Sequence, residues 1–177
     1  MRRYIRSHLS GATYFFTVTL AERQGNDTLT RHIDALRTAV AQVKARHPFS
    51  IDAMVVLPDH LHCLWTLPPQ DGDYSLRWRQ IKSKFSAAIP KAEFISPSRQ
   101  AKGERGIWQR RYWEHQIRDE EDFARHVDYI HYNPVKHGWA KTPGAWPYSS
   151  FHRYVREGRL PADWAAGGDD GGAMFGE

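Results

Sequence analysis

The sequence predicts an α+β domain in which helices pack on an antiparallel sheet. Three observations lead to this expectation: a β-rich run at 13–20, two more on either side of Pro58-Asp59, and three segments whose apolar residues recur at helical steps of three and four. With 177 residues and a 41% hydrophobic share, the chain is long enough for one core and too short for two ordinary domains. We therefore expect one domain over 1–164 and a tail at 165–177 whose composition favours disorder.

The first strand and the first helix follow from their periodicity. Between positions 13 and 20, β-branched and aromatic residues alternate, so one side of the strand carries Tyr14, Phe16, Val18 and Leu20. Over 30–47, apolar residues recur at helical spacing, and Pro48 follows where a helix should end. The apolar face of this helix consists of Ile33, Leu36, Val40 and Val43.

The next two strands should form a hairpin. IDAMVVLP and HLHCLWTL are short apolar runs, and the Pro58-Asp59 pair between them is typical of a turn. Because residues two apart on a strand face the same way, His60 and His62 project side by side together with Leu64. The opposite side of the strand carries Leu61, Cys63 and Trp65.

A second helix is expected after the loop PPQDGDYS, with Asp73 or Ser75 as its cap. Its apolar face consists of Trp78, Ile81, Phe85 and Ala88. Four basic residues should lie mostly off that face: Arg77, Arg79, Lys82 and Lys84. The segment 90–106 has two prolines, two glycines and no periodicity, which predicts an exposed, mobile loop, and IWQRRYWEHQI predicts a fourth strand.

The third helix opens with four acidic residues in DEEDFARHVDYIHY, which suit a helix N-terminus. We expect it to end at Asn133-Pro134, because proline does not continue a helix. Tyr129 and Asn133 are four residues apart, so they are neighbours on one side of the helix. The core face should consist of Phe123, Val127 and Ile130. Short helices and turns are expected over 135–164.

Composition narrows the partners and the compartment. A net charge of +5 and a pI near 9.4 favour a polyanion as partner. The single cysteine, Cys63, excludes an intramolecular disulfide and a multi-cysteine zinc site. MRRYIRSHLSG lacks the apolar core of a signal peptide, and no run approaches the roughly 18 apolar residues of a membrane span. We therefore expect a cytoplasmic protein with no membrane partner.

Taken singly, the candidate site residues have ordinary explanations. HxH pairs on strands are frequent, and packed or exposed histidines explain most of them. Tyr129 could be an amphipathic residue at the core boundary, and Asn133 an ordinary residue before a proline. A metal site needs further ligands beside His60 and His62.

Together, however, these residues belong to a pattern that runs along the chain. The blocks RRYIRSHLSGATYFFTVTL, AMVVLPDHLHCLWTLP, RWRQIKSKF, IWQRRYWEH, HVDYIHYNPVKHGW and WPYSSFHR follow in order between Arg2 and Trp164. In these blocks the sequence resembles the REP-associated tyrosine transposases, a branch of the HUH single-tyrosine nuclease and transposase superfamily. The resemblance implies the HUH nuclease fold, a ferredoxin-like antiparallel sheet with helices packed on it, followed by a short basic and aromatic extension.

The resemblance also implies roles for single residues. His60 and His62 would be metal ligands, Tyr129 the nucleophile, and Asn133 the residue that completes the metal site, where insertion-sequence relatives usually carry glutamine. Imidazole and amide ligands with open positions suit Mg²⁺ or Mn²⁺. Tyr132 and its neighbour His131 lie so near that an assignment shifted along the helix stays open.

The implied activity is metal-dependent cleavage and rejoining of single-stranded DNA at REP-type hairpins. A phenol with its usual pKa of about 10 needs a nearby cation or base to act as a nucleophile. Attack by Tyr129 would give a 5′-phosphotyrosine adduct and a free 3′-OH that can later reverse the step. The partner would be hairpin DNA with an adjacent short recognition tetrad, and the protein would be associated with the nucleoid. A monomer is implied, although insertion-sequence relatives form dimers.

A basic region could bind this DNA. Between Arg77 and Arg118 the sequence has eleven basic and three acidic residues. Phosphate contacts are expected from Arg77, Arg79, Lys82, Lys84, Arg110, Arg111 and Arg118, and base stacking from Trp78, Trp108, Tyr112 or Trp113. Arg2, Arg3 and Arg6 lie in RRYIR, which resembles the family segment that helps to read the tetrad. For each residue singly, a solvated surface or packing is the ordinary alternative.

Two other functions stay open on the sequence alone. One is a hairpin DNA- or RNA-binding module with vestigial catalytic residues, whose binding would be indifferent to EDTA. The other is a metal hydrolase of small phosphoesters that uses His60 and His62, with Tyr129 only structural. His115 could approach the site, contact DNA or be structural.

Overall fold

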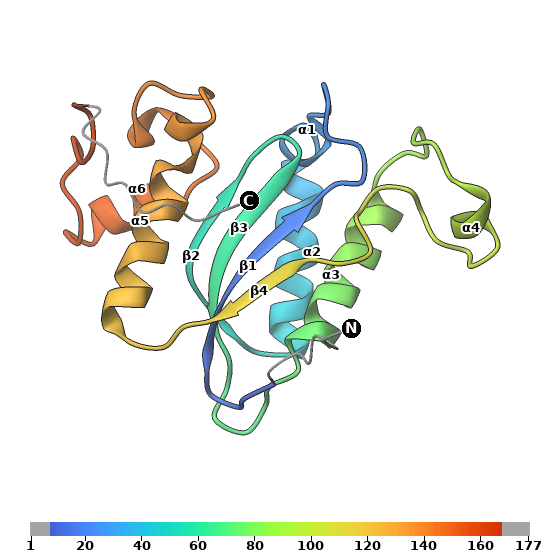
Figure 1. Cartoon of the computed structure of the whole chain (residues 1–177), viewed down its shortest axis with the longest axis horizontal. Helices are drawn as coiled ribbons and strands as arrows, with labels where there is room; N and C mark the ends of the chain where they lie inside the picture. The colour runs from blue at the N-terminus through green and yellow to red at the C-terminus, as the bar shows by residue number, and fades with distance from the viewer. Residues whose placement is uncertain (1–7, 168–177) are drawn as a thin grey trace, which may run out of the picture.

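The computed structural model describes residues 8–167, which form a four-stranded antiparallel sheet with helices on both faces (Figure 1). The strand order is β2-β3-β1-β4, so the predicted α+β class is confirmed. The strands are β1 (Thr13–Thr19), β2 (Ser50–Val56), β3 (His60–Thr66) and β4 (Trp113–Gln116). The helices are α1 (Thr28–Arg31), α2 (Ile33–Arg46), α3 (Tyr74–Ala88), α4 (Pro97–Gln100), α5 (Glu120–Lys136), the 3₁₀ turn η1 (Pro143–Ala145) and α6 (Phe151–Arg156).

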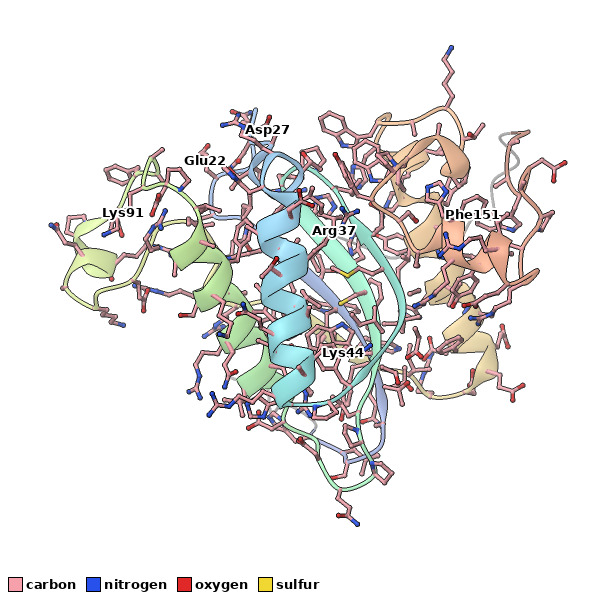
Figure 2. All side chains as sticks on the ribbon, turned by 180° about the vertical axis from the view of Figure 1, so that it is seen from behind. Glu22, Asp27, Arg37, Lys44, Lys91 and Phe151 are labelled. Atoms are coloured by element: carbon pink, nitrogen blue, oxygen red, sulfur yellow. The ribbon has the colours of Figure 1, made fainter. Side chains whose placement is uncertain are left out.

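One face of the sheet is covered by α2 and α3, which lie side by side across it (Figure 2). The predicted alternation of β1 is confirmed, because Tyr14 and Phe16 are fully buried in this core. Trp65 of β3 stacks on Trp78 of α3 with ring centroids 4.2 Å apart. The aromatic residues of these strands therefore hold the two helices on this face, and the other face is left for α5.

The second face packs against α5. Val127 and Ile130 of this helix belong to a second core with Phe15, Ala53 and Leu64 of the sheet. Since Leu64 shares a strand side with His60 and His62, the histidine pair also faces α5, as the alternation predicts. Figure 1 shows α5 and α6 together on one side of the sheet.

The C-terminal segment covers the edge of β2 that has no neighbouring strand in the sheet. Ser150 donates its backbone N–H to the carbonyl of Met54 at 2.8 Å, and the Val56 N–H bonds to the carbonyl of Tyr148 at 2.9 Å. An edge strand left open would offer its unpaired backbone groups to other chains. The extension at 135–164 therefore completes the domain, with the short helices and turns that its sequence predicts.

The predicted end of the third helix was wrong. α5 runs through Pro134 to Lys136. Because proline has no N–H, the helix loses one backbone hydrogen bond, the one to the Ile130 carbonyl. Only about one turn of helix follows this position. Pro134 is buried, and the His137 N–H bonds to the carbonyl of Asn133 at 3.1 Å, so packing and capping offset the loss. Asn133 consequently lies inside the helix.

The segment between α3 and β4 is mostly exposed, as predicted, but it contains the short helix α4. Arg105 fastens it to the end of α3 through hydrogen bonds to the carbonyls of Ile89 and Pro90 at 3.2 and 2.9 Å and through an ion pair with Glu93. The Arg105 guanidinium holds the pKa of Glu93 at about 2. The segment is thus tied down at its base, although it projects from the body in Figure 1.

The predicted fourth strand is confirmed, although it is only four residues long. One smaller prediction was wrong, because Ala88 at the end of α3 is exposed and Ile89 turns into the core in its place. Among the helices within 8–167, none has the length and apolar character needed to cross a lipid bilayer.

Candidate active site

The histidine pair lies at the centre of the sheet, on the face that α5 covers. His60 and His62 are 3% and 1% exposed, and their ring centroids are 4.9 Å apart. The Nε2 atom of each is buried without a hydrogen-bond partner among the residues that the structure describes. A buried polar atom without a partner costs about 1–3 kcal/mol, so two such atoms side by side point to a ligand.

The other nitrogen of each ring is held by a neighbour. His60 Nδ1 donates to Asp59 Oδ1 at 2.6 Å, and His62 Nδ1 pairs with Thr17 Oγ1 of β1 at 2.9 Å. With Nδ1 protonated, each Nε2 presents its lone pair. A carboxylate or hydroxyl behind the imidazole is the usual support of a metal-bound histidine. The hydrogen bonds therefore orient both rings for metal binding.

Burial keeps both imidazoles neutral. It lowers the pKa of His60 despite the hydrogen bond to Asp59, and it lowers the pKa of His62 well below the usual value, with His60 adding a smaller effect. Burial would raise the pKa of Asp59, but hydrogen bonds from Arg23 and His60 bring it below its ordinary value. A neutral imidazole is the protonation state that coordinates a metal.

Tyr129 and Asn133 approach the pair from α5. The Tyr129 ring lies 5.1 Å from the His62 ring and 5.9 Å from that of Phe15. Asn133, one helical turn further on, is fully buried, and neither its amide oxygen nor its nitrogen has a partner among the described residues. Lys136 places its ammonium 5.0 Å from the centre of the Tyr129 ring. The four predicted site residues thus come from β3 and α5, which pack on each other.

The side chains present fit a divalent cation. Two neutral imidazole nitrogens and an amide oxygen are ligand types that Mn²⁺ and, less readily, Mg²⁺ accept. The fit rests on the ligand atoms of His60, His62 and Asn133, which are buried and have no hydrogen-bond partner among the described residues.

Sequence reasoning missed His137, which caps α5 and lies with its ring 5.2 Å from that of His60. It follows Tyr129 and Asn133 at steps of four, so helical spacing could have revealed it once the helix was extended past Pro134. His131, in contrast, lies on another side of α5. It bonds to Ser150 Oγ at 2.9 Å, and burial lowers its pKa to about 3.

A second group of metal-capable side chains lies further along the same face. The ligand atoms of His115, Asp122 and His126 lie within 4.8 Å of one another, so the group could hold a metal ion. Asp122 Oδ2 already accepts hydrogen bonds from His115 Nε2 at 2.8 Å and from the Arg118 N–H at 3.0 Å. His115 therefore joins β4 to the start of α5.

Some of the residues predicted to contact DNA are exposed, and others are buried. Arg79, Lys84, Arg110 and Arg111 are exposed, Lys82 is half-buried, and Trp113 is 51% exposed on the active-site face. Arg2, Arg3 and Arg6 lie outside the described residues.

Three of these predictions were wrong. Arg77 is fully buried and bonds to the carbonyls of His47 and Pro48 and to Asp71 at 3.2, 2.8 and 2.7 Å, so its guanidinium cannot reach a phosphate. Trp108 is 6% exposed and packs on Phe85, which leaves it no open ring face for a base; Trp78, a further stacking candidate, is buried too.

Several basic residues line a groove of about 800 Å³ between α3 and the segment that precedes β4. Its walls include Arg79, Lys82, Lys91, Arg99 and Arg110. Arg110 also pairs with Glu104 at 2.8 Å. The groove adjoins α3, so it lies on the other side of the sheet from the histidine pair, with β4 at the edge between them.

Comparisons with known proteins point to one family. The family model "Transposase IS200 like" matches residues 10–133. A REP-associated tyrosine transposase of Escherichia coli (strain K12) is 48% identical over 93% of this chain and 92% of its own. A Haemophilus influenzae protein, provisionally given the same name, is 44% identical over 96% of each chain.

A solved structure is similar over the whole length. It is described as the REP-associated tyrosine transposase bound to a REP hairpin, and it matches with a TM-score of 0.81 and 45% identity, over 100% of this chain and 99% of that one. The similarity covers fold and sequence together. The chain therefore belongs to the IS200-like transposases and, within them, to the REP-associated tyrosine transposases, which are DNA-cleaving enzymes.

Proposed function

We propose that the protein is a metal-dependent single-strand DNA endonuclease and transesterase that cleaves and rejoins DNA at REP-type hairpins. One observation carries the proposal: the buried Nε2 atoms of His60 and His62, which have no hydrogen-bond partner within residues 8–167, face the helix that brings Tyr129 to 5.1 Å from the His62 ring. The hairpin-bound relative supports the DNA partner.

The ligands of the metal would be His60, His62 and Asn133. A Mg²⁺ or Mn²⁺ ion held there would polarise the scissile phosphate and stabilise negative charge that develops on it. Asp59 and Thr17 orient the two imidazoles. Of the two ions, manganese tolerates histidine ligands better.

Tyr129 would be the nucleophile. Its phenolic oxygen forms a bond to phosphorus while the bond from phosphorus to the 3′ oxygen breaks. The phenolic proton goes to solvent, and the departing 3′ oxygen takes up a proton to become a 3′-OH. Lys136, 5.0 Å from the Tyr129 ring, can offset the negative charge that the phosphate brings. Because the 5′-phosphotyrosine bond conserves the phosphodiester, attack by a 3′-OH rejoins DNA without ATP.

The basic groove would bind the DNA backbone. Phosphates would lie along Arg79, Lys82 and Arg110, and a strand that leaves the groove past β4 would meet the exposed ring of Trp113, 5.9 Å from Phe15. Both halves of the site come from one chain, which supports a monomer as the active form. Binding to chromosomal hairpins would place the protein at the nucleoid.

The test is formation of a covalent protein–DNA adduct on a single-stranded REP-type hairpin oligonucleotide with Mg²⁺ or Mn²⁺. The wild-type chain should form an adduct that resists denaturation, and EDTA should abolish it. Tyr129→Phe should form none, since the attacking oxygen is absent.

The matched control is Tyr132→Phe, which removes a phenol three residues later on the same helix and should keep the adduct. An adduct that persists in Tyr129→Phe would overturn the assignment of the nucleophile. Tight binding to the hairpin with no adduct from the wild type, with or without metal, would instead identify a binding module.

A further inference from the structure

A cavity that the proposed chemistry does not use opens beside His60. Its volume is about 720 Å³, within the range of about 300–1,000 Å³ typical of pockets for small organic molecules. Loops from three parts of the chain form it: the loop before α1, the turn between β2 and β3, and the segment after α5. Its lining includes Arg23, Arg31, His60, His137, Trp139 and Trp146.

Two tryptophans form one wall of this cavity, and both are anchored. Trp146 donates Nε1–H to the carbonyl of Val56 at 3.0 Å. Trp139 is held through its backbone, whose N–H bonds to the Pro134 carbonyl at 2.8 Å. That bond needs a left-handed residue after the helix, and Gly138 supplies it with φ +72°. The Trp146 ring and the Trp139 backbone are therefore fixed in place.

The Trp139 ring is available to a ligand. It is 53% exposed, and its centroid lies 6.4 Å from that of Trp146. An exposed, anchored aromatic ring in a cavity of this size suits a nucleobase, because every base has a π face that can stack. Within residues 8–167, Phe94 and Trp113 are the other large aromatic side chains that are at least half exposed, and neither lines this cavity.

The charges of the cavity suit a nucleotide. Arg23 pairs with Asp59 at 2.7 Å, and its side chain is 46% exposed. Arg31 pairs with Asp27 and is more exposed still, at 63%. Each guanidinium has five N–H donors, more than these contacts use, so both can also bind phosphate oxygens.

The position of the cavity indicates which nucleotide it would take. In phosphoryl transfer the attacking and leaving oxygens lie roughly in line on opposite sides of phosphorus. Tyr129 lies against His62, whereas the cavity adjoins His60 through His137, whose ring is 5.2 Å from that of His60. A phosphate held at the histidine pair would therefore have its leaving oxygen on the side of the cavity.

We infer that this cavity binds the unpaired nucleotide immediately 5′ of the scissile phosphate, with its base stacked on Trp139. This inference rests on the proposed function, because it takes Tyr129 as the nucleophile. It assigns a nucleotide subsite to residues after α5, a segment with no predicted role in the sequence. A stacked base there would hold the 3′ oxygen in place for both cleavage and rejoining.

The experiment uses the full chain with Tyr129→Phe, so that no cleavage occurs. Hairpin oligonucleotides with single-stranded flanks carry 2-aminopurine, whose fluorescence falls on stacking, at one position at a time. Wild-type protein maps the scissile phosphate on the same hairpin without the probe. We expect quenching at the position directly 5′ of that phosphate. Adding Trp139→Ala should abolish this quenching and weaken the affinity for the hairpin about tenfold.

The matched control is Phe94→Ala, which removes a comparably exposed ring elsewhere and should leave quenching and affinity unchanged. An oligonucleotide that is abasic at the quenched position should bind with equal affinity to the proteins with and without Trp139→Ala. The inference is overturned if no position depends on Trp139, or if the dependent position lies 3′ of the cleaved phosphate. The quenching assay does not require cleavage. If the wild type forms no adduct but quenching still depends on Trp139, the proposed function fails while the nucleotide site stands.

Discussion

Each imidazole of the pair is oriented by a different neighbour. His60 is held by Asp59, the preceding residue in the hairpin turn, whereas His62 depends on Thr17 from the adjacent strand. Supporting groups of this kind typically contribute 10–100-fold to metal affinity or activity. At the scale of single residues, the site therefore extends to the side chains that orient the two imidazoles.

We expect Thr17→Val to raise the Mn²⁺ concentration needed for half-maximal adduct formation by about 10-fold or more, because the His62 ring loses its hydrogen bond. Valine has nearly the same shape, so the fold should be unchanged by circular dichroism. Thr19→Val, two residues along the same strand, is the control. Equal metal dependence in all three proteins would show that Thr17 does not position His62.

Two neighbouring arginines of α3 should respond in opposite ways. Arg77→Met should lower the free energy of unfolding by about 3 kcal/mol or more, because it leaves Asp71 and buried carbonyls without their partner. Arg79→Met should leave stability unchanged but weaken hairpin binding and reduce the salt dependence, the slope of log K against log salt, by about 1.

Urea denaturation and binding titrations at several salt concentrations check this pair. A stable Arg77→Met protein would contradict the structural role of Arg77. An unchanged salt slope in Arg79→Met would remove Arg79 from the DNA surface.

At the scale of elements, α5 carries the proposed nucleophile. Its first turn is fixed by Asp119, which caps the helix at the N–H of Asp122, and by the bonds that Asp122 accepts from β4. Its last turns carry Tyr129, Asn133 and His137 at steps of four. The helix is thus held at one end, and it presents the candidate site residues at the other.

The start of α5 should make stability depend on pH. Burial would raise the pKa of Asp122, but hydrogen bonds from His115 and Arg118 outweigh it and hold the pKa at about 2, below the usual 3.8. A carboxylate with a depressed pKa in the folded state stabilises the fold above pH 4, and this contribution is lost as the pH falls from about 4 to 2.

We therefore expect Asp122→Asn to lose about 2 kcal/mol of unfolding free energy at pH 7 and to show a flatter decline between pH 4 and 2. Urea unfolding across this range measures both effects. Glu121→Gln, an exposed neighbour in the same turn, should change little. Parallel curves for wild type and Asp122→Asn would contradict the role of Asp122.

At the scale of the whole molecule, the sheet separates two surfaces with proposed roles in DNA binding. The basic groove adjoins α3 on one face, the histidine pair and α5 lie on the other, and the tryptophan-lined cavity opens beside the start of β3. DNA that contacts both must pass the β4 edge. The C-terminal segment contributes to this architecture, because Trp164 packs with ring centroids 6.1 Å from Phe151 and 6.4 Å from His131.

We propose a folding domain that ends near Trp164, and truncation tests it. A chain that ends at Gly167 should keep the melting temperature of the full chain within about 1 °C. A chain that ends at Pro161 should melt several degrees lower, because it lacks the Trp164 contacts, worth about 1–2 kcal/mol. Calorimetry of the three proteins checks the boundary, and equal melting temperatures would place it earlier.

Local sequence patterns were sufficient to predict much of this fold. Strand alternation in β1 and β3, the hairpin at Pro58-Asp59 and the Asp73 cap of α3 depend on near neighbours, and each is found as predicted. The facing of His60 and His62 toward one side of the sheet also follows from alternation alone. These features depend on backbone geometry, which nearby residues determine.

The sequence by itself determined the α+β class, the family pattern and the residues that could carry the chemistry. Only the tertiary structure decided that Arg77 is buried, that α5 continues through Pro134, and that Trp139 faces a cavity beside His60. The reason is physical. Burial, capping and cavity walls depend on groups that are far apart along the chain, such as the carbonyls around Arg77, and their free energies outweigh the local preferences that periodicity reports.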